Sequence, residues 1–158
     1  MGESGIGEAD NAGVIVRPPV LYAAALVALL VLRWLWPLPI LPRGGLWPGL
    51  VLVALGVGIL IWGRRTLLAG GTNVDPSLPA TAVVTSGPYR LSRNPLYVGL
   101  ALVYFGLTLA LDSWWGIVLL VAVLIVMHRG VIQREERYLE QKFGDGYRQY
   151  RSTVRRYI

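Results

Sequence analysis

The side chains best suited to chemistry in this sequence lie at two places, each at the edge of a long apolar run. The first is the segment GPYRLSRNPLYVGL, residues 87–100, whose polar side chains are those of Tyr89, Arg90, Arg93, Asn94 and Tyr97. The second is the adjacent pair Glu135 and Glu136, in the charged stretch that follows the last apolar run. Carboxylate, guanidinium, amide and phenol groups bind polar ligands, so these two places define the candidate site.

The Glu135–Glu136 pair is expected on a helix, where adjacent side chains point about 100° apart. One carboxylate can therefore face the interior while the other meets solvent. A buried carboxylate requires a cationic or hydroxyl partner, and Arg90, Arg93 or the amine or ribose of a ligand would supply it. The alternative is a solvated helix face, in which neighbouring arginines on the same helix pair with both glutamates.

Arg90 and Arg93 also have two interpretations. Arginines beside a membrane span commonly contact lipid phosphate. Here, however, the turn signal Gly87–Pro88 and the helix breaker Pro95 bracket the segment. Such a segment leaves backbone donors at the start of a helix, and a helix N-terminus attracts anionic groups such as a ligand carboxylate.

The composition excludes several classes of site. The chain has no cysteine and a single histidine, His128, so it cannot build a cysteine or histidine metal cluster, and we expect no metal. His128 is either a general base or, as is commoner for a histidine at the end of a span, an interface residue. The net charge of +6 comes from basic residues that flank apolar runs, which favours a membrane and not a nucleic acid as the partner.

The elements that position these residues are long apolar helices. A membrane-spanning helix needs about 20 mostly apolar residues. The sequence predicts an all-α integral membrane protein with about four transmembrane helices, at residues 18–38, 46–68, 95–111 and 114–130. The last two are short and form a helical hairpin, followed by a cytosolic helix. Gly49, Gly56 and Gly58, with Ala54, would let the second helix pack closely against a neighbour.

The rest of the chain divides around these spans. Residues 1–15 are polar and small and are expected to form a disordered tail, which leaves 16–158 as the single domain. The connection 70–94 is long, and an unstructured connection of this length usually has a function. Residues 131–158 are predicted to form a helix stopped by Gly144 and Gly146, then a basic tail that binds the anionic leaflet.

The basic residues also predict the orientation in the membrane. Every Lys and Arg except Arg33 and Arg43 falls on the side that holds both termini and the 70–94 connection. The positive-inside rule places that side in the cytosol. The brevity of the chain and its composition rich in Ala, Gly, Leu, Val and Arg indicate a bacterial inner membrane.

Two linked motifs carry a family resemblance. VTSGPYRLSRNPLYVG, followed about 35 residues later by REERYLEQKFGDGYRQYRSTVRRYI, resembles the isoprenylcysteine carboxyl methyltransferase family. That family shares a superfamily with the phospholipid N-methyltransferases. The resemblance spans residues 72–157 and implies a membrane enzyme that uses S-adenosyl-L-methionine.

By motif position, the resemblance implies a set of cofactor-binding residues on the cytosolic side. They are Thr81, Ala82, Val83, Val84, Tyr89, Asn94, Pro95, Leu96, Tyr97 and Glu135. The resemblance assigns no catalytic residue, and Arg93 and Glu136 are our candidates for that role. The acceptor it implies is a small lipophilic amphiphile, most simply an isoprenoid or prenylcysteine-like carboxylate that is O-methylated. We expect this acceptor to enter from the bilayer between the second span and the hairpin.

The sequence departs from the family pattern at three positions. Asn94 replaces the usual histidine before the proline, and Val131 stands where eukaryotic members place a substrate-contacting arginine. Arg129 or Arg134 would have to replace that arginine. Only Gly99 remains of the G-x-G that phospholipid methyltransferases carry near this site.

Three alternatives therefore stay open. The first is a phospholipid N-methyltransferase, whose amine acceptor would need a base. The second is an enzyme related to the membrane sterol reductases, which carry a similar R-[HN]-P-x-Y-x-G motif and bind NADPH, although they are usually longer. The third is a non-catalytic membrane scaffold that keeps only the shell of the pocket.

Overall fold

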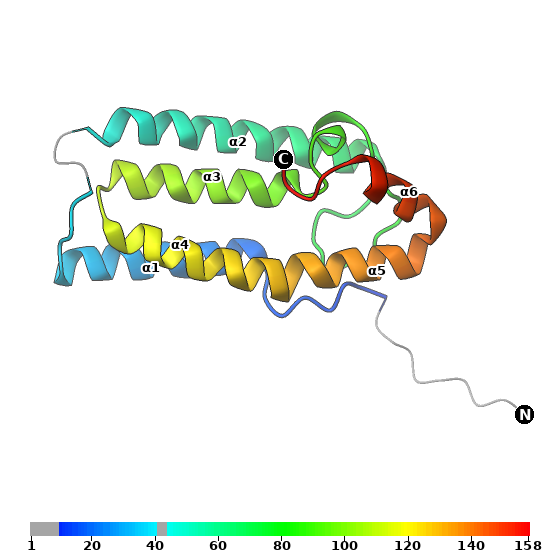
Figure 1. Ribbon diagram of the computed structural model, residues 1–158, viewed down its shortest axis with the longest axis horizontal. Coiled ribbons are helices and arrows are strands. Elements are labelled where there is room, and N and C mark those ends of the chain that lie inside the picture. The colour runs from blue at the N-terminus through cyan, green and yellow to red at the C-terminus, as the bar shows by residue number, and fades with distance from the viewer. Residues whose placement is uncertain (1–9, 41–43) are drawn as a thin grey trace, which may run out of the picture.

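The computed structural model describes residues 10–40 and 44–158, and within them every regular element is a helix (Figure 1). Four helices run side by side: α1 (Pro18–Leu35), α2 (Leu46–Ala69), α3 (Pro95–Ala110) and α4 (Trp114–Val126). Proline stands in the first turn of α1 and of α3, where its missing N–H costs no hydrogen bond. The all-helical prediction is confirmed, and each predicted span corresponds to one helix.

The fourth helix continues well past its apolar part. After α4 the chain passes through one π-helical stretch, η2 (Met127–Ile132), and goes on as α5 (Gln133–Phe143). Gly144, with φ of +54°, then reverses the chain into the short helix α6 (Asp145–Thr153). Gly144 is thus the predicted stop, whereas Gly146 lies inside α6, so the stop predicted there is wrong.

The helix lengths fit a membrane protein. Three helices are long and apolar enough to cross a bilayer, namely α1, α2 and the continuous helix Trp114–Phe143, while α3 is apolar but has 16 residues. The continuous helix has 30 residues and rises about 45 Å, whereas a hydrocarbon core is about 30 Å thick. Because α4 is apolar and α5 is charged, we place the excess length, and therefore α5, outside the membrane.

Glycines let α2 and α3 pack against each other along their length. A Cβ atom on Gly49 would come within 2.5 Å of the Gly106 carbonyl oxygen, and one on Gly56 within 2.8 Å of the Gly99 carbonyl oxygen. Gly58 has no such neighbour within 4 Å, so the predicted role in packing holds for Gly49 and Gly56 alone. This close contact corrects our expectation of an acceptor entrance between the second span and the hairpin, because α2 closes against α3 there.

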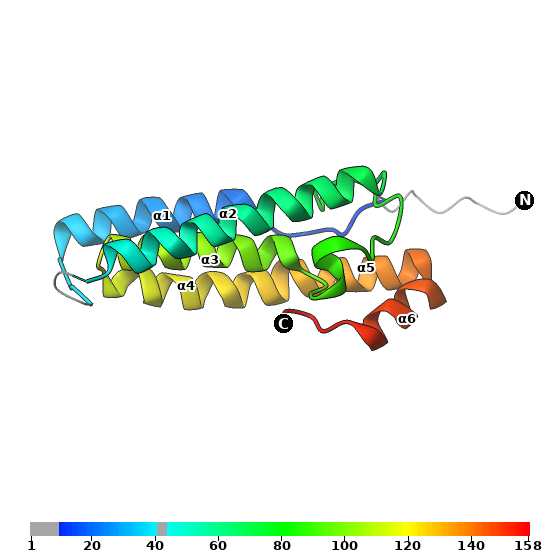
Figure 2. The same ribbon diagram turned by 90° about the horizontal axis from the view of Figure 1, so that it is seen from above.

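The other neighbours of these helices define the core. Figure 2 shows the same helices from above, with α5 and α6 extending beyond one end of the bundle. α1 packs against α4 and α3, although α2 follows it in the chain. The main buried cluster lies among these three helices and includes Leu29, Tyr104, Val123 and Met127. A second buried cluster, of Tyr89, Tyr147 and Tyr150, lies at the end of the bundle beyond the apolar segments.

The N-terminal segment packs against η2. Residues 10–15 belong to the tail that we expected to be disordered, and residues 1–9 of that tail, like Arg43, lie outside the described ranges. The Ile15 N–H donates to the Gly130 carbonyl at 3.2 Å, and the Ala12 N–H donates to the Pro76 carbonyl at 3.4 Å. A π-helical turn leaves carbonyl groups available, and Ile15 uses one of them. Residues 10–15 therefore form part of the folded domain.

Candidate active site

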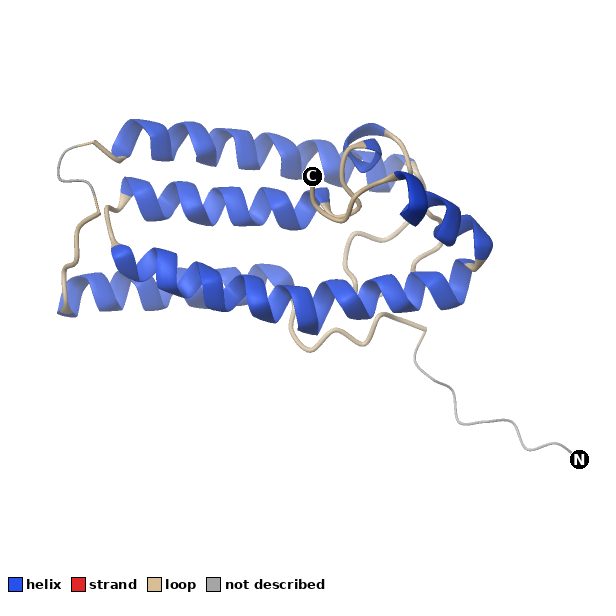
Figure 3. Cartoon of the chain, viewed as in Figure 1, coloured by secondary structure: helices blue, strands red, loops and turns tan. Residues whose placement is uncertain are grey.

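The loops and the short helices gather at one end of the bundle (Figure 3). Residues of these elements line a cavity. Its walls come from the 70–94 connection, the start of α3, α5 and α6. The volume of the cavity between these walls is about 90 Å³. Nine of the ten predicted cofactor-binding residues line it, namely Ala82, Val83, Val84, Tyr89, Asn94, Pro95, Leu96, Tyr97 and Glu135. The cavity is thus a narrow slot that unites these residues.

Thr81 is the predicted cofactor-binding residue that does not line the cavity. Its hydroxyl donates to the Gly71 carbonyl at 2.6 Å, and its N–H donates to the Thr72 hydroxyl at 3.1 Å. These two bonds close the base of the loop that follows α2. Thr81 therefore shapes the loop whose next residues, from Ala82 onwards, form the wall.

Glu135 points into the interior and is bound by Tyr97. The Tyr97 hydroxyl donates to Glu135 Oε2 at 2.6 Å, from the first turn of α3 to the first turn of α5. Burial has the largest effect on the pKa of the Glu135 carboxyl and raises it. The hydrogen bond from Tyr97 lowers the pKa, and the nearby charge of Glu136 raises it. The pKa of Glu135 therefore lies above its ordinary value. The carboxyl keeps further acceptor capacity for a ligand hydroxyl.

Glu136 is also buried, and two arginines neutralise it. Arg93 Nη1 lies 3.1 Å from Glu136 Oε1, and both side chains are less than a tenth exposed. Arg156 binds the same carboxylate with two hydrogen bonds, of 2.9 and 2.8 Å. Arg93 and Glu136, our two candidates for a catalytic role, are therefore partners of each other. A buried carboxylate without such partners would be very costly, so this cluster holds the wall in place.

Arg93 nevertheless keeps a free donor at the cavity. Its side chain is 8% exposed and lines the slot, and its Nε–H has no hydrogen-bond partner among the described residues. A buried N–H of a charged group is costly to leave unpaired. The slot thus holds a cationic donor available to an anionic or carbonyl group of a ligand.

Three tyrosines form an aromatic wall. Gly87, with φ of +56°, opens the short 3₁₀ turn η1 (Gly87–Arg90), which buries Tyr89. The Tyr150 hydroxyl donates to the Tyr89 carbonyl at 2.7 Å, and the rings of Tyr147 and Tyr150 lie 6.1 Å apart edge to face. Burial raises the pKa of Tyr147 to about 12, so it stays neutral.

Tyr147 and Tyr150 were missed by the sequence analysis. Their signal is the spacing of three residues within YRQY, which puts both rings on one face of a helix. We expected that segment to be a basic tail that binds the anionic leaflet, so that prediction makes no use of the spacing.

Residues 154–158 form a strap across the site. The Asn94 side-chain amide donates to the Arg156 carbonyl at 2.9 Å, and the Arg93 N–H donates to the Arg155 carbonyl at 3.0 Å. The Tyr157 hydroxyl lies 2.6 Å from His128 Nδ1. We expected this basic tail to bind the anionic leaflet, and the structure instead packs it against the site. Asn94 lines the cavity, but its side-chain amide already donates one hydrogen bond to the strap.

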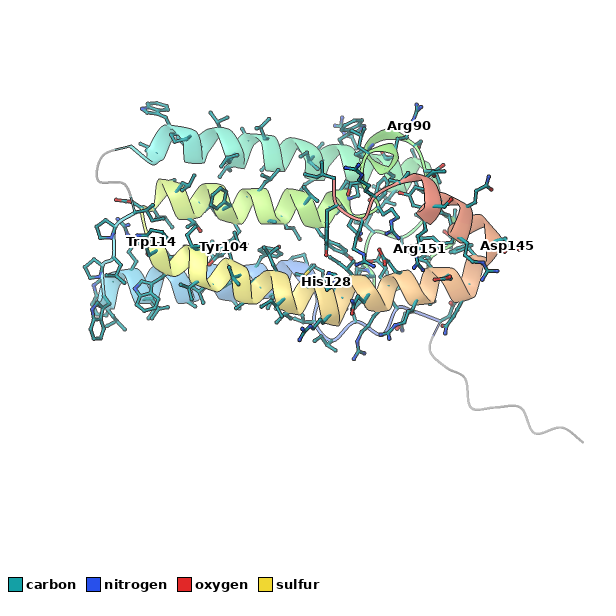
Figure 4. All side chains as sticks on the ribbon, viewed as in Figure 1. Arg90, Tyr104, Trp114, His128, Asp145 and Arg151 are labelled. Carbon is teal, nitrogen blue, oxygen red and sulfur yellow. The ribbon has the colours of Figure 1, made fainter. Side chains whose placement is uncertain are left out.

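Arg90 and His128, the remaining two candidate residues, lie apart from the slot (Figure 4). Arg90 is exposed on η1 and does not line the slot, so it does not pair with either glutamate. His128 lies in η2, bonded to Tyr157 on one side and 3.1 Å from Gln133 Nε2 on the other. No group of three His, Cys, Asp or Glu in the described ranges is arranged to hold a metal ion.

These groups together suit a polar ligand that carries a flat ring. The Glu135 carboxyl has acceptor capacity and the Arg93 guanidinium has donors, and the rings of Tyr89 and Tyr147 line the cavity together with the apolar Val83 and Leu139. The fold and the site thus define a helical membrane protein with a small-molecule cavity at the membrane boundary.

Comparison with known proteins gives the family. A family model described as phospholipid methyltransferase matches residues 45–146, more than half of the chain and most of the cavity wall. The chain belongs to this family of membrane methyltransferases. Two curated relatives also match parts of it, and no solved structure does.

The two relatives differ in how much of them the chain covers. An uncharacterized protein of Haemophilus influenzae is 39% identical over 66 residues, which are 40% of this chain and all of the relative. The protein-S-isoprenylcysteine O-methyltransferase of Schizosaccharomyces pombe is 38% identical over 72 residues, 46% of this chain. The match spans 30% of the yeast enzyme's own length.

Proposed function

We propose that this protein uses S-adenosyl-L-methionine to methylate an amphiphilic acceptor, an isoprenoid or prenylcysteine-like carboxylate, and is thus an O-methyltransferase. The observation that carries the proposal is the slot in which Glu135, Tyr97 and Arg93 meet, within the segment that the family model matches. The yeast relative is named for the same type of reaction.

The residues of the slot fit this cofactor. In the proposal Glu135 accepts hydrogen bonds from the ribose hydroxyls, and the unpaired Arg93 Nε–H receives the carboxylate of the methionine part. Tyr89 and the apolar wall cover the adenine ring. The sulfonium supplies an activated methyl group, so the protein's work is to align the two reactants and exclude water.

The slot must widen for such a ligand, because small-molecule sites commonly measure about 300–1,000 Å³. The wall that can move is the 70–86 loop, which has no regular secondary structure. The Ala80 N–H donates to the Tyr138 hydroxyl of α5 at 3.1 Å, and the Ala12 N–H of the N-terminal segment donates to the Pro76 carbonyl of the loop at 3.4 Å. We infer that the loop moves away from α5 when the cofactor enters.

The nature of the acceptor separates the favoured reaction from its main alternative. A carboxylate is already nucleophilic, whereas an ammonium must first lose a proton to a base. In the slot Glu136 is neutralised by two arginines, which leaves Glu135 as the base that phospholipid N-methylation would require. That alternative is equally compatible with the family.

We propose that the end of the bundle bearing the slot faces the cytosol of a bacterial cell, with both termini on that side. Nearly all the basic residues flank this end, and a Haemophilus influenzae relative matches the chain. The cofactor then arrives from the cytosol and the acceptor from the bilayer.

The test is methyl transfer from labelled S-adenosyl-L-methionine to a bacterial membrane lipid extract by the detergent-purified protein. We expect label in an alkali-labile ester, which releases methanol on hydrolysis. Label that resists hydrolysis and stays with an amine head group would favour the phospholipid alternative. A folded protein that binds the cofactor yet labels no lipid would support the scaffold alternative.

A further inference from the structure

The N-terminal segment, residues 10–15, lies outside the part of the chain that the family model matches, yet it reaches the slot. Ala12 lines the slot and is 8% exposed. In Figure 1 this segment, in blue, runs along the continuous helix that ends in α5. Its contacts with that helix and with the 70–86 loop show how it can act on the slot.

Polar contacts attach the segment to the continuous helix. Both carboxylate oxygens of Asp10 lie 2.7 Å from the Lys142 ammonium nitrogen. The Arg134 guanidinium donates to the Gly13 carbonyl at 2.9 Å. The Ile15 N–H bonds the η2 turn, as described above. The segment therefore lies along the wall of the slot that α5 forms.

The same segment is also attached to the loop that forms the opposite wall. The Ala12 N–H donates to the Pro76 carbonyl of the loop at 3.4 Å. The Tyr138 hydroxyl of α5 donates to Asp10 Oδ1 at 2.8 Å and accepts the Ala80 N–H of the loop at 3.1 Å. The segment, α5 and the loop thus meet in one set of hydrogen bonds, which holds the two walls together.

With these contacts made, the slot is too small for the ligand of the proposed function. Its volume is about 90 Å³, whereas small-molecule sites commonly measure about 300–1,000 Å³. The loop is the wall that can move, and its links to α5 and to the N-terminal segment oppose that movement. A contact made only in the narrow state and a ligand that fits only the wide state weaken each other.

The ionic part of these contacts is weak enough to be reversible. The Asp10 side chain is 57% exposed and the Lys142 side chain 28% exposed. An exposed ion pair contributes little to stability, because water competes for both charges. The Arg93–Glu136 pair on the same side of the molecule is instead buried, at 8% and 9% exposure. Ligand binding can therefore break the first pair while the second keeps the rest of the wall in place.

We propose that residues 10–15 form an autoinhibitory latch, which holds the 70–86 loop against α5 and keeps the slot narrow until a ligand displaces the loop. The proposal rests on the proposed function, because it concerns the entry of the cofactor into the same slot. Latch and ligand compete, so a weaker latch means tighter ligand binding.

The first experiment is hydrogen–deuterium exchange of the detergent-purified full chain without ligand. In Asp10→Asn the amides of the latch and of the loop should exchange about 2- to 5-fold faster, the worth of one exposed ion pair. The control is Glu140→Gln, which removes an α5 ion pair of the same 2.7 Å length, with Arg151 of α6, and should leave the loop unchanged. Equal loop exchange in Asp10→Asn and the wild type would overturn the proposal.

The second experiment is titration with S-adenosylhomocysteine. Asp10→Asn and Lys142→Gln change the net charge in opposite directions, and neither position lines the slot. Both variants should nevertheless bind about 2- to 5-fold tighter than the wild type, chiefly through faster association. The double variant should gain no more than either single one, because all three lose the same contact.

The outcomes of this titration separate the latch from the proposed function. Binding by the variants that is unchanged or weaker than that of the wild type would overturn the latch. Absence of binding by every protein would contradict the proposed function, and loop exchange then decides on the latch alone.

Discussion

The Tyr97 hydroxyl binds Glu135 Oε2 at 2.6 Å, and the same tyrosine lines an apolar cavity on the other side of α3. One residue thus belongs to both the polar slot and the apolar cavity. In the proposed enzyme the slot holds the methyl donor.

The first prediction concerns pH. Burial raises the pKa of Glu135 above its ordinary 4.5, so the carboxylate that accepts ribose hydroxyls forms only as the pH rises through the raised value. Binding of S-adenosylhomocysteine should therefore tighten as the pH rises through this raised value. The same raised pKa works against folding stability, which falls as the pH rises through it. Calorimetric titration at several pH values measures the first effect.

The variants for this test are close in sequence. Glu135→Gln cannot titrate and should lose the pH dependence along with much of the affinity. Tyr97→Phe removes the hydrogen bond that lowers the pKa, so the midpoint should move to higher pH. Glu140→Gln, on the same helix and outside the slot, should behave like the wild type. A flat profile in the wild type would refute the role given to Glu135.

The second prediction is that Glu136 stabilises the fold. Glu136→Ala leaves Arg93 buried without its carboxylate and should cost about 3–5 kcal/mol. For a chain of this size that lowers the Tm by roughly 6–20 °C. Glu140→Ala removes a more exposed ion pair with Arg151 and should cost about 1 kcal/mol or less. Thermal unfolding in detergent measures the Tm of both variants. Equal decreases in Tm would show that the buried Glu136 cluster stabilises the fold no more than the exposed Glu140–Arg151 pair does.

The third prediction concerns the strap. Arg156→Ala removes the bidentate bond but leaves the Arg93–Glu136 pair, so its Tm should lie between those of Glu136→Ala and the wild type. Arg156→Lys should recover only part of the loss, because an ammonium cannot reproduce two parallel hydrogen bonds. Full recovery with lysine would mean that charge alone matters at this position.

The fourth prediction tests the packing of α2 on α3. Gly56→Leu would drive a side chain into the Gly99 backbone and should destabilise the protein by about 1–3 kcal/mol or more. Gly58→Leu, half a turn away and exposed, meets no neighbour and should be neutral. If both variants unfold at the same temperature, the α2–α3 contact is not closed as described.

The sequence was informative where a local pattern decides the structure. Apolar runs predicted the four helices of the bundle, and Pro95 and Gly144 predicted where helices begin and end, whereas α6 was not predicted. The motif around Asn94 and Tyr97, with Glu135, predicted side chains that meet in one slot although they lie about 40 residues apart.

The features that were missed depend on contacts between distant segments. Nothing local in RRYI indicates that Arg156 binds Glu136 or that Tyr157 reaches His128, because those bonds require α6 to reverse the chain at Gly144. The charge of the tail alone therefore predicts binding to the anionic leaflet. The acceptor entrance was placed wrongly for a similar reason, since the sequence does not reveal that α1 packs against α4 while α2 closes on α3.

The measurement that tests the central claim most directly is a titration of S-adenosylhomocysteine into the detergent-purified protein, with Glu135→Ala and Glu140→Ala beside the wild type. We predict saturable one-site binding by the wild type and by Glu140→Ala, and loss of binding by a folded Glu135→Ala. Absence of binding by the folded wild type, or undiminished binding by Glu135→Ala, would contradict the account.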